Sequence, residues 1–491
     1  MAEAESSANR IYIGLLGYGT VGSNVYNLIN DQAVEIAQAT GANIAIRKIL
    51  VRDRSIPRQD APAELFTDNF DDILNDSEIS IVVELMGGIE PAFDYISSAL
   101  VKDKAVVTAN KQLLSQKGSY LFGLAREKGT QIRFEASVAG AIPVVKVLRE
   151  SMVAADLTSV YGIVNGTTNY ILSEMSRTGA KYQDALANAQ EWGYAESDPT
   201  EDISGKDAAA KMAILASIAF HTAVGLDDVA CVGIEHISSL DISFARNLNL
   251  TVKLLGVAKL YDDRINVRVY PALLKKDHPL ATVGGAYNAV FLKGNSIDEI
   301  MLSGPGAGGI ETASAVVSDI VSIIARDTPG VLKNIAPWRK LDFYPDDDVV
   351  SKFYLRLEVE DEPGVLATIA QVFGDHDVSV EGAIQQGRGA PAELVLLFDP
   401  VREAGAGGGL AGGAAQAAGA VVHCGVGGLQ GQQHQQDGSA ALKKDANATG
   451  CVTIEVGRDE DVVGVALAVQ EQPLERARER DVVELEHFHR I

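Results

Sequence analysis

Short apolar runs alternate, in the first third of the chain, with segments whose apolar residues recur every three or four positions. The runs predict buried strands at 10–16, at 42–51, within 78–88 and within 104–111. The periodic segment at 23–38 predicts a helix directly after the first strand. Strands that alternate with helices in this way are typical of an α/β fold built on a parallel sheet.

An acidic stretch and an amphipathic helix follow each other at 193–220. The acidic residues are Glu196, Asp198, Glu201, Asp202 and Asp207. Ala208, Met212, Leu215 and Ala219 predict one buried stripe of the helix, and Asp207, Lys211, Ile214 and Ile218 a neighbouring one. Asp207 and Lys211 thus border an apolar face, where burial and pairing can tune a pKa. The alternative is an ion pair on a solvated helix, worth about 0.3–0.5 kcal/mol.

A glycine-rich turn, GYGTVG, joins the strand at 10–16 to the helix at 23–38. Gly17 allows a tight turn, Gly19 lets the backbone approach a pyrophosphate, and Gly22 lets the helix pack on the strand. Thr20 and Val21 lie at the helix start, whose N–H groups favour phosphate. We therefore expect a Rossmann-type dinucleotide site, although a turn that only packs is the alternative.

The strand at 42–51 ends in charged residues that bear on the choice of cofactor. An acid here suits the ribose of NAD, and an arginine suits the 2′-phosphate of NADP. Because Arg52 and Arg54 flank Asp53, NADP is favoured and NAD stays allowed. Ordinary solvation of two arginines is the alternative.

Polar residues also end the strand within 104–111. Thr108, Asn110 and Lys111 follow its apolar run. In open α/β sheets, ligands bind beyond the carboxyl ends of the strands, so these residues are expected to border the cofactor. For Lys111 the alternative is a solvated loop lysine.

The segment 159–175 predicts a strand followed by a polar helix start. Asn165, Gly166, Thr167 and Thr168 stand at that start. A glycine-bearing helix N-terminus can bind an anion, here one the size of a carboxylate. Plain N-capping by Asn or Thr is the alternative.

The composition excludes several classes of partner. Lys and Arg number 42 and Asp and Glu 66, for a net charge of −24, which argues against nucleic acid or an anionic membrane. Cys231, Cys424 and Cys451 share no metal-ligand or redox spacing, which suits a reducing cytoplasm. Without signal-peptide features or an apolar run of about 18 residues, a cytoplasmic protein is expected.

Six motifs carry a resemblance to a known family. They are GYGTVG, VVELMGG, VTANK, EASVAGAIP, GIVNGTTNYIL and GYAESDPTEDISGKDAAAKMAILA. In this order the chain resembles homoserine dehydrogenase, and SGPGAGGIETASAVVSDI fits that family's returning segment. The resemblance covers residues 10–385. It implies NAD(P)H-dependent interconversion of L-aspartate 4-semialdehyde and L-homoserine, in the pathway to threonine and methionine.

The resemblance implies roles for five side chains. Lys211 matches the family's proton-donating lysine and Asp207 its supporting aspartate. Lys111 matches the lysine that touches cofactor and substrate, while Glu196 and Asp202 match carboxylates that hold the substrate. A lysine ammonium can protonate a developing alkoxide if its pKa falls towards neutrality. Whether Lys111, which lowers that pKa, or Asp207, which raises it, dominates stays open.

The resemblance also implies a monovalent-cation site, sodium in the family, made of backbone oxygens. The matching residues are Glu135, Val138, Gly140 and Ile142. Ala141 stands where the family often has a second glycine, a small departure because carbonyl oxygens hold the cation. Gly306, in the returning segment, is a further expected cofactor contact.

Residues 352–386 predict strand, helix and strand, and resemble the first half of an ACT domain, a module that senses amino acids. Asp361, Pro363 and Gly364 stand where such modules bind an effector, usually threonine in this family, or pair across a dimer. A purely structural module is the alternative.

The chain departs from the ACT pattern after the strand at 394–403. Residues 403–420 are rich in glycine, which costs a helix about 1 kcal/mol per residue relative to alanine. Residues 429–445 are polar and of low complexity, so a flexible tail is expected. A shifted reading frame after about residue 404 is a hypothesis that resequencing the encoding DNA tests, because an intact frame would dispose of it.

The expected organisation is α/β with five parts. These are a Rossmann domain at 1–135, an α+β substrate-binding and dimerisation domain at 136–309, a returning helix at 310–340, a partial ACT-like (ferredoxin-like) domain at 350–403 after a linker at 342–348, and an atypical tail at 404–491. A homodimer or homotetramer is expected.

Two rival functions stay open: a catalytically inactive amino-acid sensor, and another NAD(P)-dependent amino-acid or semialdehyde dehydrogenase. Intact Lys111, Asp207 and Lys211 favour the enzyme over the sensor. A thioester-forming enzyme would need a nucleophilic cysteine, and Cys231 has no motif around it.

Overall fold

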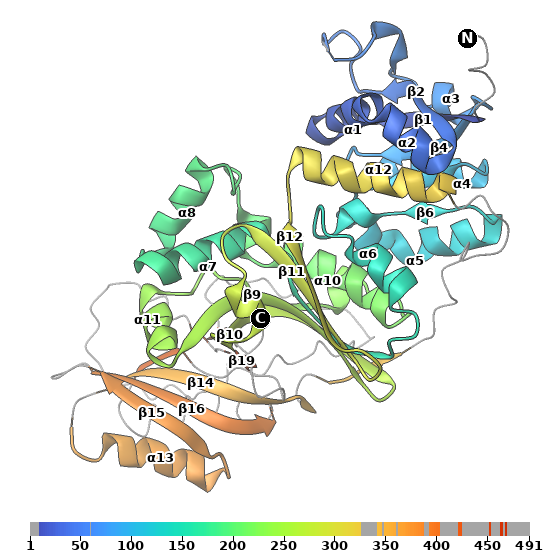
Figure 1. The fold of residues 1–491 in the computed structure, drawn as a ribbon. Coiled ribbons are helices and arrows are strands. Elements are labelled where there is room, and N and C mark those ends of the chain that lie inside the picture. The colour runs from blue at the N-terminus through green and yellow to red at the C-terminus, as the bar shows by residue number, and fades with distance from the viewer. Residues whose placement is uncertain are drawn as a thin grey trace, which may run out of the picture.

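The three larger β-sheets of the computed structural model, each with its own helices, follow one another from the N-terminal to the C-terminal part of the chain (Figure 1). The structure describes residues 9–58, 60–325, 341–345, 348–359, 362–386 and 392–402, with four short segments at 421–424, 451–452, 462–464 and 467–468. Asp361, the segment 403–420 and most of the tail lie outside these residues. Among the helices of these ranges, none has both the length and the hydropathy that crossing a bilayer requires.

The first sheet is parallel throughout and has the order β3-β2-β1-β4-β5-β6. Its strands are β1 (Asn9–Leu16), β2 (Ala42–Leu50), β3 (Phe66–Thr67), β4 (Ile79–Glu84), β5 (Ala105–Thr108) and β6 (Ile132–Arg133). The strand order reverses between β1 and β4, which opens a crevice for a dinucleotide at the carboxyl ends. The expected Rossmann-type α/β fold is confirmed.

Helices cover both faces of this sheet. They are α1 (Thr20–Asp31), α2 (Ala33–Thr40), α3 (Asp71–Leu74), α4 (Ala92–Val101) and α5 (Lys111–Lys128), with a 3₁₀ turn η1 (Ala63–Leu65). The single helix expected at 23–38 is wrong, because the chain leaves helical geometry at Gln32, with φ −106° and ψ 19°. Asn30 and Asp31, which compete with helical hydrogen bonding, precede the break.

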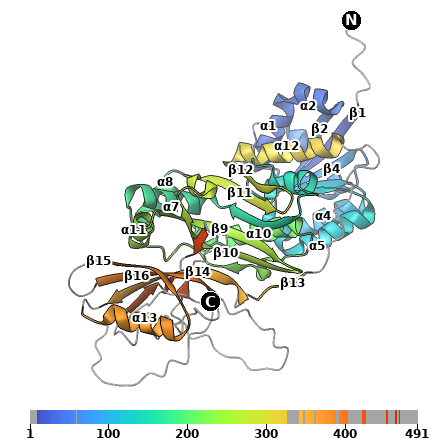
Figure 2. The same ribbon diagram turned by 60° about the horizontal axis from the view of Figure 1, so that its bottom comes forward.

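Helix α12 (Gly309–Ala325) brings the chain back to the first domain. It lies beside α1 in both views (Figures 1 and 2). Ala313, Val316 and Ile320 are buried in the same cluster as Ile13 and Leu15 of β1. Residues 326–340 lie outside the described part, and the domain limits stay predictions.

The second sheet is mixed and has the order β12-β11-β7-β9-β10-β13, with β8 and β19 also pairing with β10. Its strands are β7 (Leu157–Ile163), β8 (Ala230–Cys231), β9 (Leu250–Tyr261), β10 (Arg264–Lys275), β11 (Tyr287–Gly294), β12 (Asp298–Pro305), β13 (Asp342–Phe343) and β19 (Val462–Gly464). The linker expected at 342–348 is therefore wrong at its start, because Asp342 and Phe343 pair with β10.

Helix α10 (Lys206–Ala219) packs on this second sheet and is buried on nearly all sides. A Cβ at Gly256 of β9 would collide with the Met212 side chain, so glycine there permits the close approach of helix and sheet. The other helical segments are η2 (Glu135–Ser137), α6 (Val144–Lys146), η3 (Val147–Ser151), α7 (Gly166–Thr178), α8 (Tyr182–Glu191), α9 (Thr200–Ile203), η4 (Leu226–Asp228), α11 (Ser239–Asn247) and η5 (Pro279–Thr282).

The third sheet is antiparallel, in the order β15-β16-β14-β17, and carries one helix. Its elements are β14 (Val350–Val359), α13 (Val365–Asp375), β15 (Val380–Gln386), β16 (Ala392–Arg402) and β17 (Val421–Cys424); β18 (Cys451–Val452) and β20 (Leu467–Ala468) form a separate pair. Leu355 and Leu357 of β14 belong to the cluster that also holds Ile369 and Phe373 of α13. Tyr354 instead belongs to a cluster that also holds Val252 and Leu254 of β9, so this sheet has its other face on the second domain.

Candidate active site

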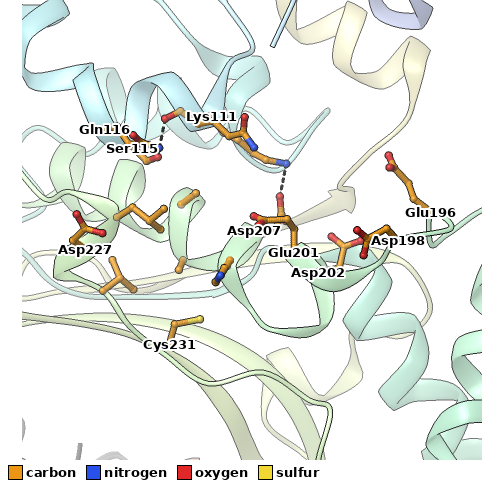
Figure 3. A pocket seen from close by; sticks show the side chains of 16 residues that line it. Lys111, Ser115, Gln116, Glu196, Asp198, Glu201, Asp202, Asp207, Asp227 and Cys231 are labelled. Atoms are coloured by element: carbon orange, nitrogen blue, oxygen red, sulfur yellow. Dashed lines mark hydrogen bonds and ion pairs between the residues drawn. The ribbon is translucent and has the colours of Figure 1, made fainter. Parts of the chain in front are cut away.

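A cleft of about 660 Å³ lies between the start of α5, in the first domain, and α9 and α10 of the second (Figure 3). It is at the carboxyl end of β5, the edge where open parallel sheets bind ligands. The lining residues are Lys111, Gln112, Ser115, Gln116, Glu196, Asp198, Glu201, Asp202, Lys206, Asp207, Ala209, Ala210, Leu226, Asp227, Val229 and Cys231.

Lys211 sits in the middle of α10 with its side chain 12% exposed. Its Nζ donates to Val164 O at 2.8 Å, just beyond the end of β7, and to Asp207 Oδ2 at 2.7 Å. The alternative of a lysine on a solvated helix face is excluded by this burial. An ammonium has three N–H groups, so these two acceptors leave a third for another partner.

Asp207 is almost fully buried and joins the two lysines. Its Oδ1 pairs with Lys111, while its Oδ2 accepts from Lys211 and, at 2.9 Å, from Asn165 Nδ2. Burial alone raises the pKa of Asp207, but the charges of Lys211 and Lys111 outweigh it and hold the pKa well below its usual range. Asp207 therefore stays ionised at neutral pH.

Lys111 is the first residue of α5, directly after Asn110, whose Oδ1 accepts from Leu113 N at 3.1 Å. Its side chain is 38% exposed and extends towards Asp207 across the cleft (Figure 3). Burial lowers the pKa of Lys111, but the charge and hydrogen bond of Asp207 outweigh it and raise the pKa above its ordinary value. Lys111 therefore stays positively charged.

Asn165 connects the lysine cluster to the acidic segment. Its Nδ2 donates to Asp202 Oδ1 at 2.6 Å as well as to Asp207, and its Oδ1 accepts from Thr168 N at 2.8 Å. It is therefore both the N-cap of α7 and a bridge between two carboxylates. Thr167 Oγ1 donates to Tyr194 O at 2.6 Å, which fixes the loop before α9.

Three acidic side chains share one end of the cleft. Figure 3 shows Glu196, Asp198 and Asp202 at the end opposite Asp227. Burial raises the pKa of Asp202, and the nearby charge of Asp207 adds to that rise. Carboxylates grouped in this way suit an ammonium group, the charge that an amino-acid substrate carries.

The glycine turn of the first domain is shaped to approach a phosphate. Gly17 has φ +99°, and a Cβ at Gly22 would collide with Gly17 O. A Cβ at Gly19 would meet open space, so this peptide faces room for a ligand at the start of α1, where Thr20 and Val21 lie. These residues fit a dinucleotide. Arg52, two residues beyond β2, is exposed.

The returning segment lies beside this turn. A Cβ at Gly309 would be 2.7 Å from Thr20 Cγ2. Three residues earlier, Gly306 lies against Gly140, where an added Cβ would be 2.6 Å from Gly306 O. The expected cofactor contact and the expected cation loop are therefore neighbours.

Thr108, at the end of β5, is turned inward. Its Oγ1 donates at 2.6 Å to Glu84 Oε2, and Glu84 Oε1 accepts from Met86 N at 2.8 Å and Gly87 N at 3.1 Å. Burial raises the pKa of Glu84. Sequence reasoning missed Glu84, although a carboxylate ending an apolar strand was the available signal. Thr108 thus fixes the Glu84 carboxylate, which in turn holds the backbone of Met86 and Gly87 at the edge of the sheet where the cofactor is expected.

The proposed cation loop is held by buried acids. Glu135 accepts through Oε1 from Val145 N at 2.8 Å and through Oε2 from Lys146 N at 2.7 Å, and its own N–H donates to Asp319 Oδ2 at 2.7 Å. Burial and the charge of Asp319 raise the pKa of Glu135 to about 7. Gly140 has φ +55°.

Carbonyl oxygens are hard ligands, the donor type that suits an alkali cation. Val138 and Ile142 are buried, and Ile142 O accepts from Val144 N at 2.7 Å. A carbonyl keeps a second lone pair after one hydrogen bond, so the residues named by the resemblance fit such an ion.

Three buried polar residues near the site were not found from the sequence. Asp319 of α12 holds the loop at Glu135. Asn288 of β11 is fully buried and lies against Gly306, and its amide has no hydrogen-bond partner among the described residues. Lys253 of β9 is also buried. Each is a polar residue inside an apolar run, which is the only sequence signal available.

Comparison with known proteins gives the family. A family model described as homoserine dehydrogenase matches residues 143–321, one described as its NAD binding domain matches 17–135, and one described as an ACT domain matches 353–410. The homoserine dehydrogenase of Bacillus subtilis is 41% identical over 400 residues, which cover 80% of this chain and 92% of that protein. That of Corynebacterium glutamicum is 41% identical over 391 residues, covering 78% and 88%.

Solved structures give the same result. A homoserine dehydrogenase from Thiobacillus denitrificans has a TM-score of 0.75 and 37% identity, covering 81% of this chain and 93% of that one. A hyperthermophilic archaeal homoserine dehydrogenase in complex with NADPH has a TM-score of 0.55 and 27% identity, covering 65% and 99%.

Proposed function

Because this chain belongs to the homoserine dehydrogenase family, we propose that Lys211 is the proton donor and acceptor of its reaction. The chain is an NAD(P)-dependent oxidoreductase that interconverts L-aspartate 4-semialdehyde and L-homoserine. The family assignment favours the enzyme over the inactive sensor. What supports the role of Lys211 is its ion pair with Asp207, a carboxylate that lines the cleft and also pairs with Lys111.

Lys211 is arranged to move one proton. Val164 O and Asp207 Oδ2 accept two of its three N–H groups. The third can be given to the substrate oxygen as the aldehyde is reduced, and is recovered when homoserine is oxidised. The bound nicotinamide supplies the hydride chemistry. Lys111, held cationic by Asp207, adds a second positive charge where the oxygen becomes negative.

The ammonium group and the carboxylate of the substrate are proposed to bind at two separate places. Glu196 and Asp202, two of the three carboxylates at the acidic end of the cleft, bind the ammonium, in line with the family resemblance. Gly166 and Thr167, in the first turn of α7, bind the carboxylate through the helix N-terminus, with Asn165 fixing that turn. Lys111 contacts both substrate and cofactor.

The cofactor is proposed to lie along the glycine turn, with Gly17, Gly19 and Gly22 allowing the approach of its pyrophosphate. Arg52 supports NADP over NAD, because an exposed guanidinium beyond β2 suits a 2′-phosphate. Thr108 and Gly306 border the nicotinamide half.

Several finer features belong to the same proposal. Sodium binds the backbone oxygens of Glu135, Val138, Gly140 and Ile142. The ACT domain binds an amino-acid effector, threonine, near Gly364. The chain works in the cytoplasm as a homodimer or homotetramer.

The central role is tested by homoserine-dependent reduction of NADP and of NAD, with and without threonine. Lys211→Ala is expected to lower kcat roughly 10²–10⁴-fold, the contribution of a positioned acid or base. Lys117→Ala changes an exposed lysine of α5 outside the cleft and is expected to leave kcat unchanged. A kcat for Lys211→Ala within about threefold of the wild type would remove Lys211 from the proposed role.

A further inference from the structure

Lys253 is a lysine in the interior of the second domain, only 2% exposed. Its Nζ donates to Val283 O at 2.5 Å, to Asn169 Oδ1 at 2.8 Å and to Ser173 Oγ at 3.4 Å. All three acceptors are neutral, and burial lowers the pKa of Lys253 to about 8. An amine buried in this way is costly unless its hydrogen bonds are satisfied, so its surroundings are built around it.

Asn169 of α7 works with Lys253 on the same short segment, residues 283–287. Its Nδ2 donates to Val283 O at 3.1 Å and to Tyr287 O at 3.0 Å, which fixes both ends of the segment. The segment contains Gly284 and Gly285, the latter with φ +60°. Two successive glycines have little conformational preference of their own, so the segment depends on these anchors for its shape.

The other side of this segment lies on the start of α7. A Cβ at Gly166 would be 2.7 Å from Ala286 O, so the two backbones are in direct contact. The residue before Gly166 is Asn165, whose amide joins Asp202 and Asp207. The anchored segment therefore supports the helix N-terminus to which the carboxylate of homoserine is assigned above.

We propose that Lys253 is a positioning residue for homoserine: with Asn169 it holds residues 283–287 against Gly166 and so fixes the carboxylate site at the start of α7. Lys253 does not touch the reacting atoms. This inference rests on the proposed function, because it takes the start of α7 as the substrate carboxylate site.

The test separates positioning from folding and from chemistry. Lys253→Met removes the three donors at similar side-chain length. It is expected to raise the KM for homoserine about tenfold or more and to weaken homoserine binding by the same factor in calorimetric titration. The KM for NADP and kcat are expected to stay within about threefold of the wild type.

Lys104→Met is the matched control. Lys104 is also buried and also donates to two carbonyl oxygens, Asp76 O at 2.7 Å and Ile79 O at 2.6 Å, but at the amino end of β5, away from the cleft. It is expected to lower the unfolding temperature without a change in the homoserine KM. An equal rise of the homoserine KM in Lys104→Met would overturn the proposal.

Asn169→Ser provides a second variant if Lys253→Met does not fold. It removes the bonds to Val283 O and Tyr287 O and is expected to raise the homoserine KM in the same selective way. A folded Lys253→Met or Asn169→Ser protein with an unchanged homoserine KM overturns the positioning role. Loss of kcat in Lys211→Ala, with homoserine binding retained, tests the proton role separately.

Discussion

Two aspartates occupy matching positions in the second domain. Asp207 lies in the first turn of α10 and Asp241 in that of α11, where a negative charge suits the helix dipole. Each binds a cation from another part of the chain: Lys111 of the first domain pairs with Asp207, and Arg356 of the ACT domain pairs with Asp241 at 2.9 Å. The second domain therefore meets both neighbours through a carboxylate at a helix start.

The two pairs differ in how the second carboxylate oxygen is used. In Asp207 it accepts from Lys211 and Asn165. In Asp241 it accepts from Ser238 N at 2.9 Å and Ser238 Oγ at 2.6 Å, which is the cap of its own helix. The second oxygen of Asp207 thus binds the Lys211 ammonium, whereas that of Asp241 completes the cap of its own helix.

The pairs differ also in access to water. Lys111 is 38% exposed in a cleft, whereas Arg356 is 10% exposed and also contacts Glu393 at 3.4 Å. A cation beside a cleft can interact with a substrate oxygen without leaving its partner. A closed pair can only hold two domains together, and breaking it leaves a buried charge. An ion pair at a helix start thus serves the active site in Lys111–Asp207 and attaches the ACT domain in Arg356–Asp241.

The largest expected effect comes from removing the charge of the first aspartate. Asp207→Asn keeps the shape but leaves Lys111 and Lys211 without an anion between them, and kcat is expected to fall roughly 10²-fold or more. The matched Asp241→Asn is expected to keep kcat within about twofold and to lower stability instead. Steady-state kinetics of both proteins check this.

Equal losses of kcat in Asp207→Asn and Asp241→Asn would contradict the division into a functional and an attaching pair. Circular dichroism of both variants is the control, since a shared loss of helix would explain equal losses of activity without the cleft.

Breaking the closed pair is expected to affect stability more than activity. Arg356→Met removes the cation that pairs with buried Asp241 at 2.9 Å, and the free energy of unfolding is expected to fall by about 3 kcal/mol. Lys352→Met, on the same strand, breaks an exposed pair with Glu381 and is expected to cost about 0–1 kcal/mol. Denaturant unfolding of the two variants gives the comparison, and an equal cost would show that the burial of Arg356 is energetically unimportant.

Much of the active site could be predicted from the sequence because the residues that form it are close together along the chain. Asp207 and Lys211 are one helical turn apart, so the spacing alone places them together. The glycine turn is likewise read from a strand, three glycines and a helix in succession. The pairing of Lys111 with Asp207 is different, since the two residues belong to separate domains and meet only through the tertiary fold.

The residues that support the site could not be predicted, because their contacts also form only in the tertiary fold. Lys253 and Asn288 stand in strands, and nothing local shows that one contacts a loop and the other Gly306. The strand of Asp342 and Phe343 forms only because the edge of β10 is available to pair with it. The break at Gln32 follows Asn30 and Asp31, whose competition with helical hydrogen bonds the 3.6-residue period does not encode.

The smallest expected effect concerns Asp202, whose pKa is shifted in the opposite direction from that of Asp207. The two carboxylates are linked because both accept a hydrogen bond from Asn165 Nδ2. Burial, together with the charge of Asp207, raises the pKa of Asp202 above its usual value of 3.8. An acid with a raised pKa in the folded state costs stability when ionised, and that cost disappears as the pH falls through the raised pKa. Asp207, with its lowered pKa, stays ionised over the same range.

Acidification therefore has opposite effects on binding and on stability at Asp202, which makes the two separable. Protonation removes a carboxylate proposed for the ammonium of homoserine, so the KM for homoserine is expected to rise a few-fold on the acid side, about 1 kcal/mol in binding. Asp202→Asn is expected to have a higher KM that no longer changes with pH. The pH profiles of KM in the two proteins, with unfolding temperatures measured alongside, check this; a KM that rises only as the protein unfolds would contradict the proposed role of Asp202.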